Sequence, residues 1–273
     1  MAGVAVAVTA QESAEEIEQG VSQRGVGQVA TETPPLERAQ TALDGGRLEE
    51  AEAEFRQLVE EQPDSAAASF GLGAALARLR RGSEAMEHFQ RAAELDPTAA
   101  DPLVAIGDLH FGRGQLDEAL AHYRAGVEID ATSERGRLGE VQIMHRRGQY
   151  REVSGRLAEA REVLPDSGLV AYSLAWMLAA SPDASLRDGE RALDLAQGVF
   201  ESHSSLPNVE LVAEALAELD RCDKAAEFLR EMGATVPRAE APEIAERIQQ
   251  GIERFDKGSP CRAPTEPSAS VEE

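Results

Sequence analysis

A sequence pattern that returns every 34 residues is the feature that most limits how this chain can fold. Residues 51–63 read AEAEFRQLVEEQP and residues 85–97 read AMEHFQRAAELDP. Two further steps give the weaker copies ALAHYRAGVEIDA at 119–131 and VSGRLAEAREVLP at 153–165. Self-similarity at a fixed period of this size predicts a stack of repeated supersecondary units.

Each copy contains two helical stretches. In the second copy these are AAASFGLGAALARL (66–79) and SEAMEHFQRAAELD (83–96), and the latter has an apolar stripe at helical spacing. Pro97 ends this helix, because proline lacks an amide donor and disfavours the α conformation in the residue before it. Glycine marks the sharp turn between the two helices in other copies. The second copy has Arg80 there, and we expect its turn to differ slightly.

Small and aromatic residues at fixed positions predict how the helices pack. A minimal side chain, as at Gly73 and Gly107 in the first helix, lets two antiparallel helices approach closely. The aromatic residue of the second helix is then predicted to fill the wedge between neighbouring pairs. One pair cannot bury such a stripe alone, so the copies are expected to stack. The second helices repeat alanine and an aromatic residue at Ala51, Ala85 and Ala119 and at Phe55, Phe89 and Tyr123.

These positions resemble the tetratricopeptide repeat (TPR) family. The second copy matches the family pattern in full, the third matches it in large part, and the copy from about residue 134 is weaker, with Val141, Val153 and Leu157 at key sites. The resemblance implies an all-α fold, a right-handed α-solenoid of about six antiparallel helix pairs with a C-terminal capping helix. The second copy carries the match at Leu72, Gly73, Ala85, Phe89, Ala92 and Pro97, and the third at Ile106, Gly107, Ala119 and Tyr123.

The domain organisation follows from the period. A leader or signal-peptide remnant is predicted at 1–33, a solenoid at 34–256 and a disordered tail at 257–273. The fifth pair contains a longer inserted turn, SPDASLRDG. The pairs are predicted at about 34–65, 66–99, 100–133, 134–167, 168–205 and 206–239, with the cap at 240–256.

Composition excludes some classes of function. Acidic residues outnumber basic residues 50 to 27, giving a formal net charge of −23, which repels the phosphate backbone of nucleic acids. No apolar stretch approaches the roughly 18 residues of a membrane span. The apolar start MAGVAVAV has no basic residue before it. The sequence as written therefore indicates a cytoplasmic protein, or a periplasmic or exported one if residues 1–10 end a truncated signal peptide.

The two cysteines leave two alternatives. Cys222 and Cys261 are too few for a disulfide scaffold and lack the CxxC spacing of zinc or redox sites. They are either two small, partly buried thiols or a single staple between the last repeat and the tail, which an oxidising compartment would permit.

Motifs for catalysis or cofactors are weak. The stretch GLGAAL at 71–76 resembles a dinucleotide-binding loop, but its glycines are already needed for helix packing. His203 lies beside serines in a predicted flexible loop without a fixed acid partner, and His88 and His122 lack the further ligands of a metal site. His110 and His145 are predicted neighbours near a groove. We therefore predict a protein that is not an enzyme and has no cofactor or metal.

The resemblance implies binding of a protein or peptide partner. In TPR proteins the first helices line a concave groove that takes an extended peptide or a partner's helix. The carboxylate clamp of chaperone adaptors is absent, because Leu36, Gln40, Gly71, Asp101 and Ala105 stand at its positions. The main hypothesis is a non-catalytic scaffold, and the alternative is an accessory subunit of an enzyme or envelope-assembly complex whose catalytic part is on another chain.

The groove is predicted to combine aromatic side chains with a local basic site able to bind an acidic partner. Tyr172 and Trp176 could instead be buried against the inserted turn. The sequence does not specify the oligomeric state. The predicted partner-binding residues are Phe70, Arg78, Phe111, Arg135, Gln142, His145, Arg146, Tyr172 and Trp176.

Overall fold

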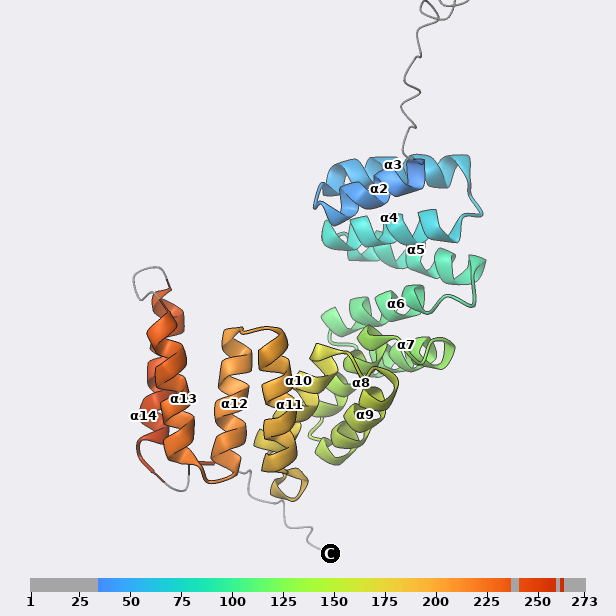
Figure 1. The fold of residues 1–273 in the computed structure, drawn as a ribbon. Helices are drawn as coiled ribbons and strands as arrows, with labels where there is room; N and C mark the ends of the chain where they lie inside the picture. Colours follow the sequence, from blue (N-terminus) through green and yellow to red (C-terminus); the bar gives the residue numbers. More distant parts are fainter. Residues whose placement is uncertain (1–33, 237–240, 259–260, 263–273) are drawn as a thin grey trace, which may run out of the picture.

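All regular elements in the described part of the chain are helices (Figure 1). The computed structural model describes residues 34–236, 241–258 and 261–262. The predicted leader at 1–33 and residues 263–273 of the predicted tail lie outside these residues. The helices are α2 (Pro35–Asp44), α3 (Leu48–Glu61), α4 (Ala66–Arg78), α5 (Gly82–Leu95), α6 (Ala100–Gly112), α7 (Leu116–Ile129), α8 (Glu134–Arg146), α9 (Tyr150–Val163), α10 (Gly168–Ala180), a short 3-10 helix η1 (Ala184–Leu186), α11 (Gly189–Ser202), α12 (Leu206–Glu218), α13 (Cys222–Thr235) and α14 (Pro242–Phe255).

Consecutive helices pack as six antiparallel pairs, from α2–α3 to α12–α13, and α14 follows as a cap. The fold is the right-handed α-solenoid predicted from the repeat. Serine begins three of the first helices: the hydroxyl oxygens of Ser65, Ser133 and Ser167 accept hydrogen bonds from amides in the first turns of α4, α8 and α10. Within the described residues no helix combines the length and apolarity needed to cross a membrane.

The turn within each of the first four pairs has the same backbone conformation, which corrects the expectation for the second pair. Gly46, Gly114 and Gly148 have φ of 74°, 76° and 71°, and Arg80 has the same left-handed conformation at 65°. The next amide, on Arg81, donates to the carbonyl oxygen of Leu76, closing the helix end as the equivalent amides do in the other pairs. Arginine in this conformation carries a steric cost that glycine avoids, and the helix-end geometry outweighs it.

Glycine permits the closest helix contacts. A Cβ added at Gly73 would lie 2.6 Å from Cδ1 of Phe89, and one added at Gly71 would lie 2.2 Å from Cε1 of Phe55. In the third pair the ring of Tyr123 lies against Gly107 on one side and Gly139 of the next pair on the other. The aromatic residues therefore fill the wedges as predicted.

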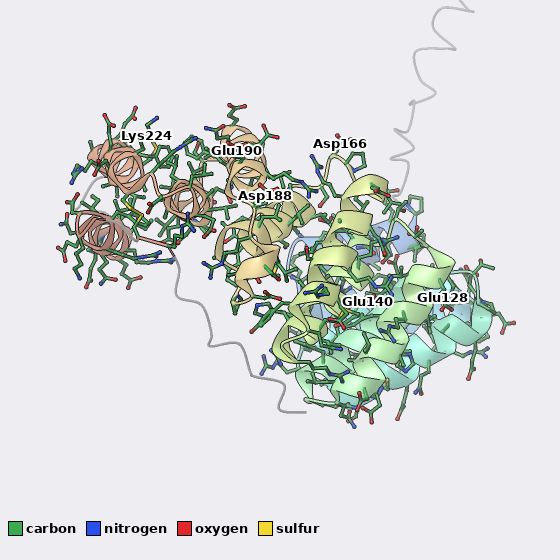
Figure 2. All side chains as sticks on the ribbon, turned by 90° about the horizontal axis from the view of Figure 1, so that it is seen from below. Glu128, Glu140, Asp166, Asp188, Glu190 and Lys224 are labelled. Carbon is green, nitrogen blue, oxygen red and sulfur yellow. A yellow bond between two sulfur atoms is a disulfide. The ribbon has the colours of Figure 1, made fainter. Side chains whose placement is uncertain are left out.

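The fourth pair, α8–α9, departs from this packing. At the position of Leu72 and Ile106 it has Glu140, which is buried at 5% exposure. Burial raises the pKa of the Glu140 carboxyl, although Arg156 lies 3.7 Å away. Glu140 is buried, whereas Glu128 on α7 is exposed; both are labelled in Figure 2.

The direction of the helices changes at the fourth and fifth pairs. In Figure 1 the helices α2–α7 lie across the view, whereas α11–α14 stand upright, with α8–α10 between them. The buried apolar residues form two clusters, one over α2–α6 and one running from α6 to the C-terminal end. The weak fourth copy thus lies where the stack bends.

The inserted turn of the fifth pair is fixed by a buried ion pair. The guanidinium of Arg187 is 3.3 Å from the carboxylate of Glu218, with the two side chains 3% and 11% exposed. Arg187 Nε also donates to the carbonyl oxygen of Ser181 at 2.6 Å. Asp188 caps α11 by accepting from the amide of Arg191. The insertion is therefore an ordered connection.

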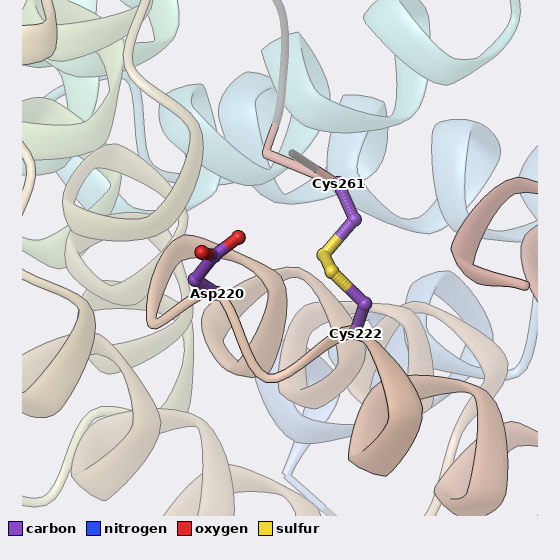
Figure 3. A group of neighbouring side chains, drawn as sticks. All are labelled: Asp220, Cys222 and Cys261. Carbon is purple, nitrogen blue, oxygen red and sulfur yellow. A yellow bond between two sulfur atoms is a disulfide. The ribbon is translucent and has the colours of Figure 1, made fainter. Parts of the chain in front are cut away.

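A disulfide between Cys222 and Cys261 closes the C-terminal end (Figure 3). Of the two alternatives for the cysteines, the structure has the staple. Asp220 lies beside the two sulfur atoms, but disulfide sulfurs are not thiolate ligands, so this cluster does not supply a metal-binding set. The bond spans 39 residues and is expected to stabilise the end by about 2–4 kcal/mol.

Helix α14 covers the apolar face of the sixth pair. Ile248 and Phe255 are buried, and Ile248 packs against Gly233 of α13. Arg254 forms an ion pair with Glu214 of α12, and one of its nitrogens donates to the carbonyl oxygen of Cys261 at 3.1 Å. The cap, the ion pair and the disulfide therefore hold one another in place.

Candidate functional site

A cavity of about 650 Å³ lies between α8 and α10, the first helices of the fourth and fifth pairs. Its walls come from side chains one helical turn apart on each helix, and its floor comes from the second helices α7 and α9. This volume falls in the range of ligand-binding clefts in proteins. The wall side chains include Leu138, Gln142, His145, Leu169, Tyr172 and Trp176.

Aromatic side chains form much of the α10 wall. Trp176 is half-buried, and its ring meets that of His145 edge-on, with centroids 5.5 Å apart. His145 in turn meets Tyr150 of α9 at 5.5 Å. Tyr172 is also half-buried, and burial raises the pKa of its hydroxyl. These rings give the cavity an apolar wall that water still reaches in part.

Leu169 stands at the mouth of the cavity with 62% of its surface exposed. It is the second residue of α10, one period after Arg135, and so occupies an inward position of the repeat. A large exposed leucine beside half-buried aromatic rings is an apolar surface of the kind found at interaction sites. Leu169 is not among the partner-binding residues predicted from the sequence, although it lies one period after Arg135, which is.

The floor of the cavity reflects the weak fourth copy. Val141, Val153 and Leu157, which replace glycine, alanine and an aromatic residue of the regular copies, all line it. The bulkier valines stand where α4–α5 and α6–α7 have small residues, and α8 and α9 approach each other less closely along their length. Leu157 then reaches less far than a phenyl ring would. The substitutions thus leave the wedge open.

Two further cavities adjoin the first. One of about 750 Å³ lies toward the starts of α8, α10 and α12, and one of about 390 Å³ lies between α10, α12 and α14. Tyr172 borders all three, and Trp176 borders the first and the smallest. The three cavities therefore meet at Tyr172, and together their lining residues extend from α8 to the cap.

Three charged side chains on this face, those of Arg135, Asp108 and Glu134, have side-chain partners. Arg135 forms an ion pair with Asp108, whose carboxylate also accepts a hydrogen bond from the Tyr123 hydroxyl at 2.6 Å. Burial and this carboxylate raise the pKa of Tyr123. Glu134 accepts a hydrogen bond from the Ser167 hydroxyl at 2.6 Å. The predicted basic site is therefore partly neutralised at Arg135.

The structure gathers five of the nine predicted residues and separates four. Phe70 packs on Phe89, with ring centroids 5.5 Å apart, and Arg78 donates to the carbonyl oxygen of Leu43. The guanidinium of Arg146 lies over the ring of Phe111 at 4.2 Å. The five that line the cavity are Arg135, Gln142, His145, Tyr172 and Trp176.

The predicted proximity of His110 and His145 is replaced by other contacts. His110 stacks on His122, with ring centroids 5.3 Å apart and an angle of 6° between the rings. Burial lowers the pKa of His122, and the charge of His110 lowers it further. His145 instead belongs to the cavity wall.

Comparisons with known proteins agree with the repeat geometry. Two family models described as tetratricopeptide repeat match, at residues 36–100 and 76–138. The chain therefore contains tetratricopeptide repeats over residues 36–138. TPR proteins generally act as scaffolds for protein–protein interaction.

Solved TPR structures share the fold of this TPR protein. One, from a functional characterisation of PilF of Pseudomonas aeruginosa, has a TM-score of 0.64 at 16% identity and covers 79% of this chain and 95% of that one. Another, YrrB, described as a TPR protein with an unusual peptide-binding site, has a TM-score of 0.54 at 16% identity and covers 74% of this chain and 97% of that one. A search of curated proteins found no match.

Proposed function

We propose that this TPR protein is a scaffold that holds a peptide segment of a partner protein on the inner face of α8 and α10. The observation that carries the proposal is the 650 Å³ cavity, in which half-buried Tyr172 and Trp176 stand beside the exposed Leu169. Tryptophan and tyrosine are enriched among the residues that carry binding energy in interfaces, and partly buried rings lose little conformational freedom on binding.

The arrangement of the three cavities supports an extended occupant. A segment lying along the face would pass Tyr172, which borders all three, and would remain in contact with α12 and the cap. The peptide-binding site named for YrrB offers a precedent within the same fold. An enzyme subunit as the owner of the bound segment is a narrower hypothesis within this proposal.

The test uses a displayed library of random twelve-residue peptides selected on the intact chain. Selected peptides are synthesised and titrated, and binding is followed through the fluorescence of Trp176, the single tryptophan of the sequence. We expect saturable binding that Leu169→Ala weakens at least about fivefold, since truncating an anchor costs more than about 1 kcal/mol.

The matched control is Ile129→Ala, which removes another exposed apolar side chain on α7, outside all three cavities. It should leave binding unchanged. Failure to enrich any peptide, or equal loss of binding in both variants, would contradict the proposed function.

A further inference from the structure

The cavity is the place where a repeated internal contact is missing. In the first and third pairs, Phe55 and Tyr123 insert beneath the next first helix at Gly71 and Gly139. The equivalent residue in the fourth pair is Leu157, and the equivalent of the glycine is Ser173, two side chains that both line the cavity. The space that an aromatic ring occupies elsewhere in the stack is thus open to the inner face here.

We propose that an aromatic side chain of the partner enters this cavity and takes the place of the missing wedge residue, with a basic residue beside it on the partner chain. This inference rests on the proposed function and specifies its ligand class. The lining suits such a ring, because Tyr172, Trp176 and Met177 of α10 provide aromatic and apolar walls and Leu157 of α9 provides an apolar floor.

The carboxylates at the edge of the cavity favour a basic residue on the partner. Asp108 is compensated by Arg135, whereas Glu134 and Asp166 border the adjoining cavity, where Leu169 and Tyr172 also lie. Figure 2 shows Asp166 at the outer edge of the connection between α9 and α10. The net charge of −23 adds a long-range attraction for basic segments. A basic residue next to the aromatic anchor therefore meets complementary charge.

An acidic partner, which the sequence suggested, fits this surface less well. Its carboxylates would approach Glu134 and Asp166, while the guanidinium of Arg135 is engaged by Asp108 and that of Arg146 lies over Phe111. Like charges at close range oppose binding. We therefore expect the bound segment of the partner to be basic, in place of the acidic partner that the sequence suggested.

The peptides selected from the random library test the ligand class directly. We expect an aromatic residue at one fixed position and lysine or arginine within a few residues of it. Replacing the aromatic residue of a selected peptide by alanine should weaken binding at least about tenfold, and replacing the basic residue by glutamate should weaken it by a similar factor. Enriched acidic peptides without an aromatic residue would overturn the inference and leave the proposed function standing.

Filling the cavity from within tests the location of the anchor. Leu157→Phe restores the wedge residue of the regular copies, and Ser173→Phe fills the space from the opposite wall. Each variant should weaken the binding of peptides with an aromatic residue at least about tenfold. Circular dichroism should show that each variant remains a folded helical chain. Val163→Phe adds the same ring at an exposed position of α9 and should leave binding unchanged.

Two outcomes separate the proposals. If no peptide binds the parent chain, the proposed function fails. If peptides bind and both folded filling variants retain full affinity, only the anchor in this cavity is wrong.

Neutralising the two carboxylates tests the charge. Glu134→Gln keeps an acceptor for the Ser167 hydroxyl, so it removes the charge with little change in structure. We expect Glu134→Gln and Asp166→Asn each to weaken the binding of basic peptides about two- to fivefold, because partly exposed ion pairs contribute little free energy. The control Glu128→Gln alters an exposed carboxylate on α7 (Figure 2) and should leave affinity unchanged. Equal affinity in all three variants would overturn the charge assignment.

Discussion

The same repeat packs closely in some pairs and loosely in another. The helices are close together in α4–α5 and in α6–α7, and they are farther apart in α8–α9. The first two bring small residues together, so that Phe89 and Tyr123 close the wedge against Gly73 and Gly107. The fourth has Glu140, Val141, Val153 and Leu157 at the corresponding positions, and the cavity opens beside it. This difference indicates that looser packing in one repeat of a solenoid can leave a cavity available for binding.

This exchange has a physical basis in how repeat proteins are stabilised. Each pair contacts mainly its neighbours, so a loosely packed unit can be supported by the close-packed pairs on either side. The cost is then local, and the open wedge lies on the inner face at the bend of the stack. Converting one kind of pair into the other tests this view.

The largest effect is expected when a regular pair is given the residue of the fourth. Gly73→Val would place side-chain atoms against the Phe89 ring, which lies only 2.6 Å from an added Cβ. Overpacking of this kind should lower the free energy of unfolding by about 1–3 kcal/mol. Urea unfolding followed by circular dichroism measures the change.

The matched control is Gly155→Val on α9, where an added Cβ meets nothing within 4 Å. Replacing a helical glycine there should be neutral or slightly stabilising. A neutral Gly73→Val would show that the second pair does not depend on close helix contact.

A smaller effect of opposite sign is expected when the fourth pair regains a core residue. Glu140→Leu places leucine at the position of Leu72 and Ile106 and removes a buried charge, while Arg156 remains 44% exposed to water. Because burying a carboxylate carries a desolvation cost that apolar packing avoids, stability should rise by about 1–2 kcal/mol. The control Glu152→Leu changes an exposed carboxylate of α9 and should stay within about 0.5 kcal/mol. A loss of stability in Glu140→Leu would mean that the carboxylate holds the pair together.

The smallest effect is the contribution of Glu140, in the fourth pair, to the dependence of stability on pH. Burial raises the pKa of Glu140 above its ordinary value of 4.5, so the folded state binds this proton more tightly than the unfolded state. The resulting stability is fully present below the unfolded pKa and is lost as pH rises through the folded pKa.

The measurement compares the parent chain with Glu140→Gln in urea at pH 7 and pH 5. The parent should gain stability relative to the variant at the lower pH, while the other carboxylates titrate in both chains and cancel. Parallel stability curves would contradict the assignment.

Periodicity predicted the helices, their pairing and the wedge residues, because these follow from local spacing and from the size of single side chains. The same reasoning placed Tyr172 and Trp176 on the inner face, since their positions repeat. It failed for Arg80, where the geometry of the helix end imposes a left-handed residue without glycine. It also grouped Arg78, Phe70 and Phe111 with the site, because a repeat position does not reveal which neighbour a long side chain will contact.

The architecture of this protein follows from its repeat, since a 34-residue period of small, aromatic and proline positions allows few ways to bury its apolar stripes. Three features could be seen only in the folded structure: the disulfide between Cys222 and Cys261, the ion pair between Arg135 and Asp108, and the cavity beside Leu157. These features join residues from different helices, and their distances depend on how closely each pair packs, a sum of small steric differences that no single position encodes.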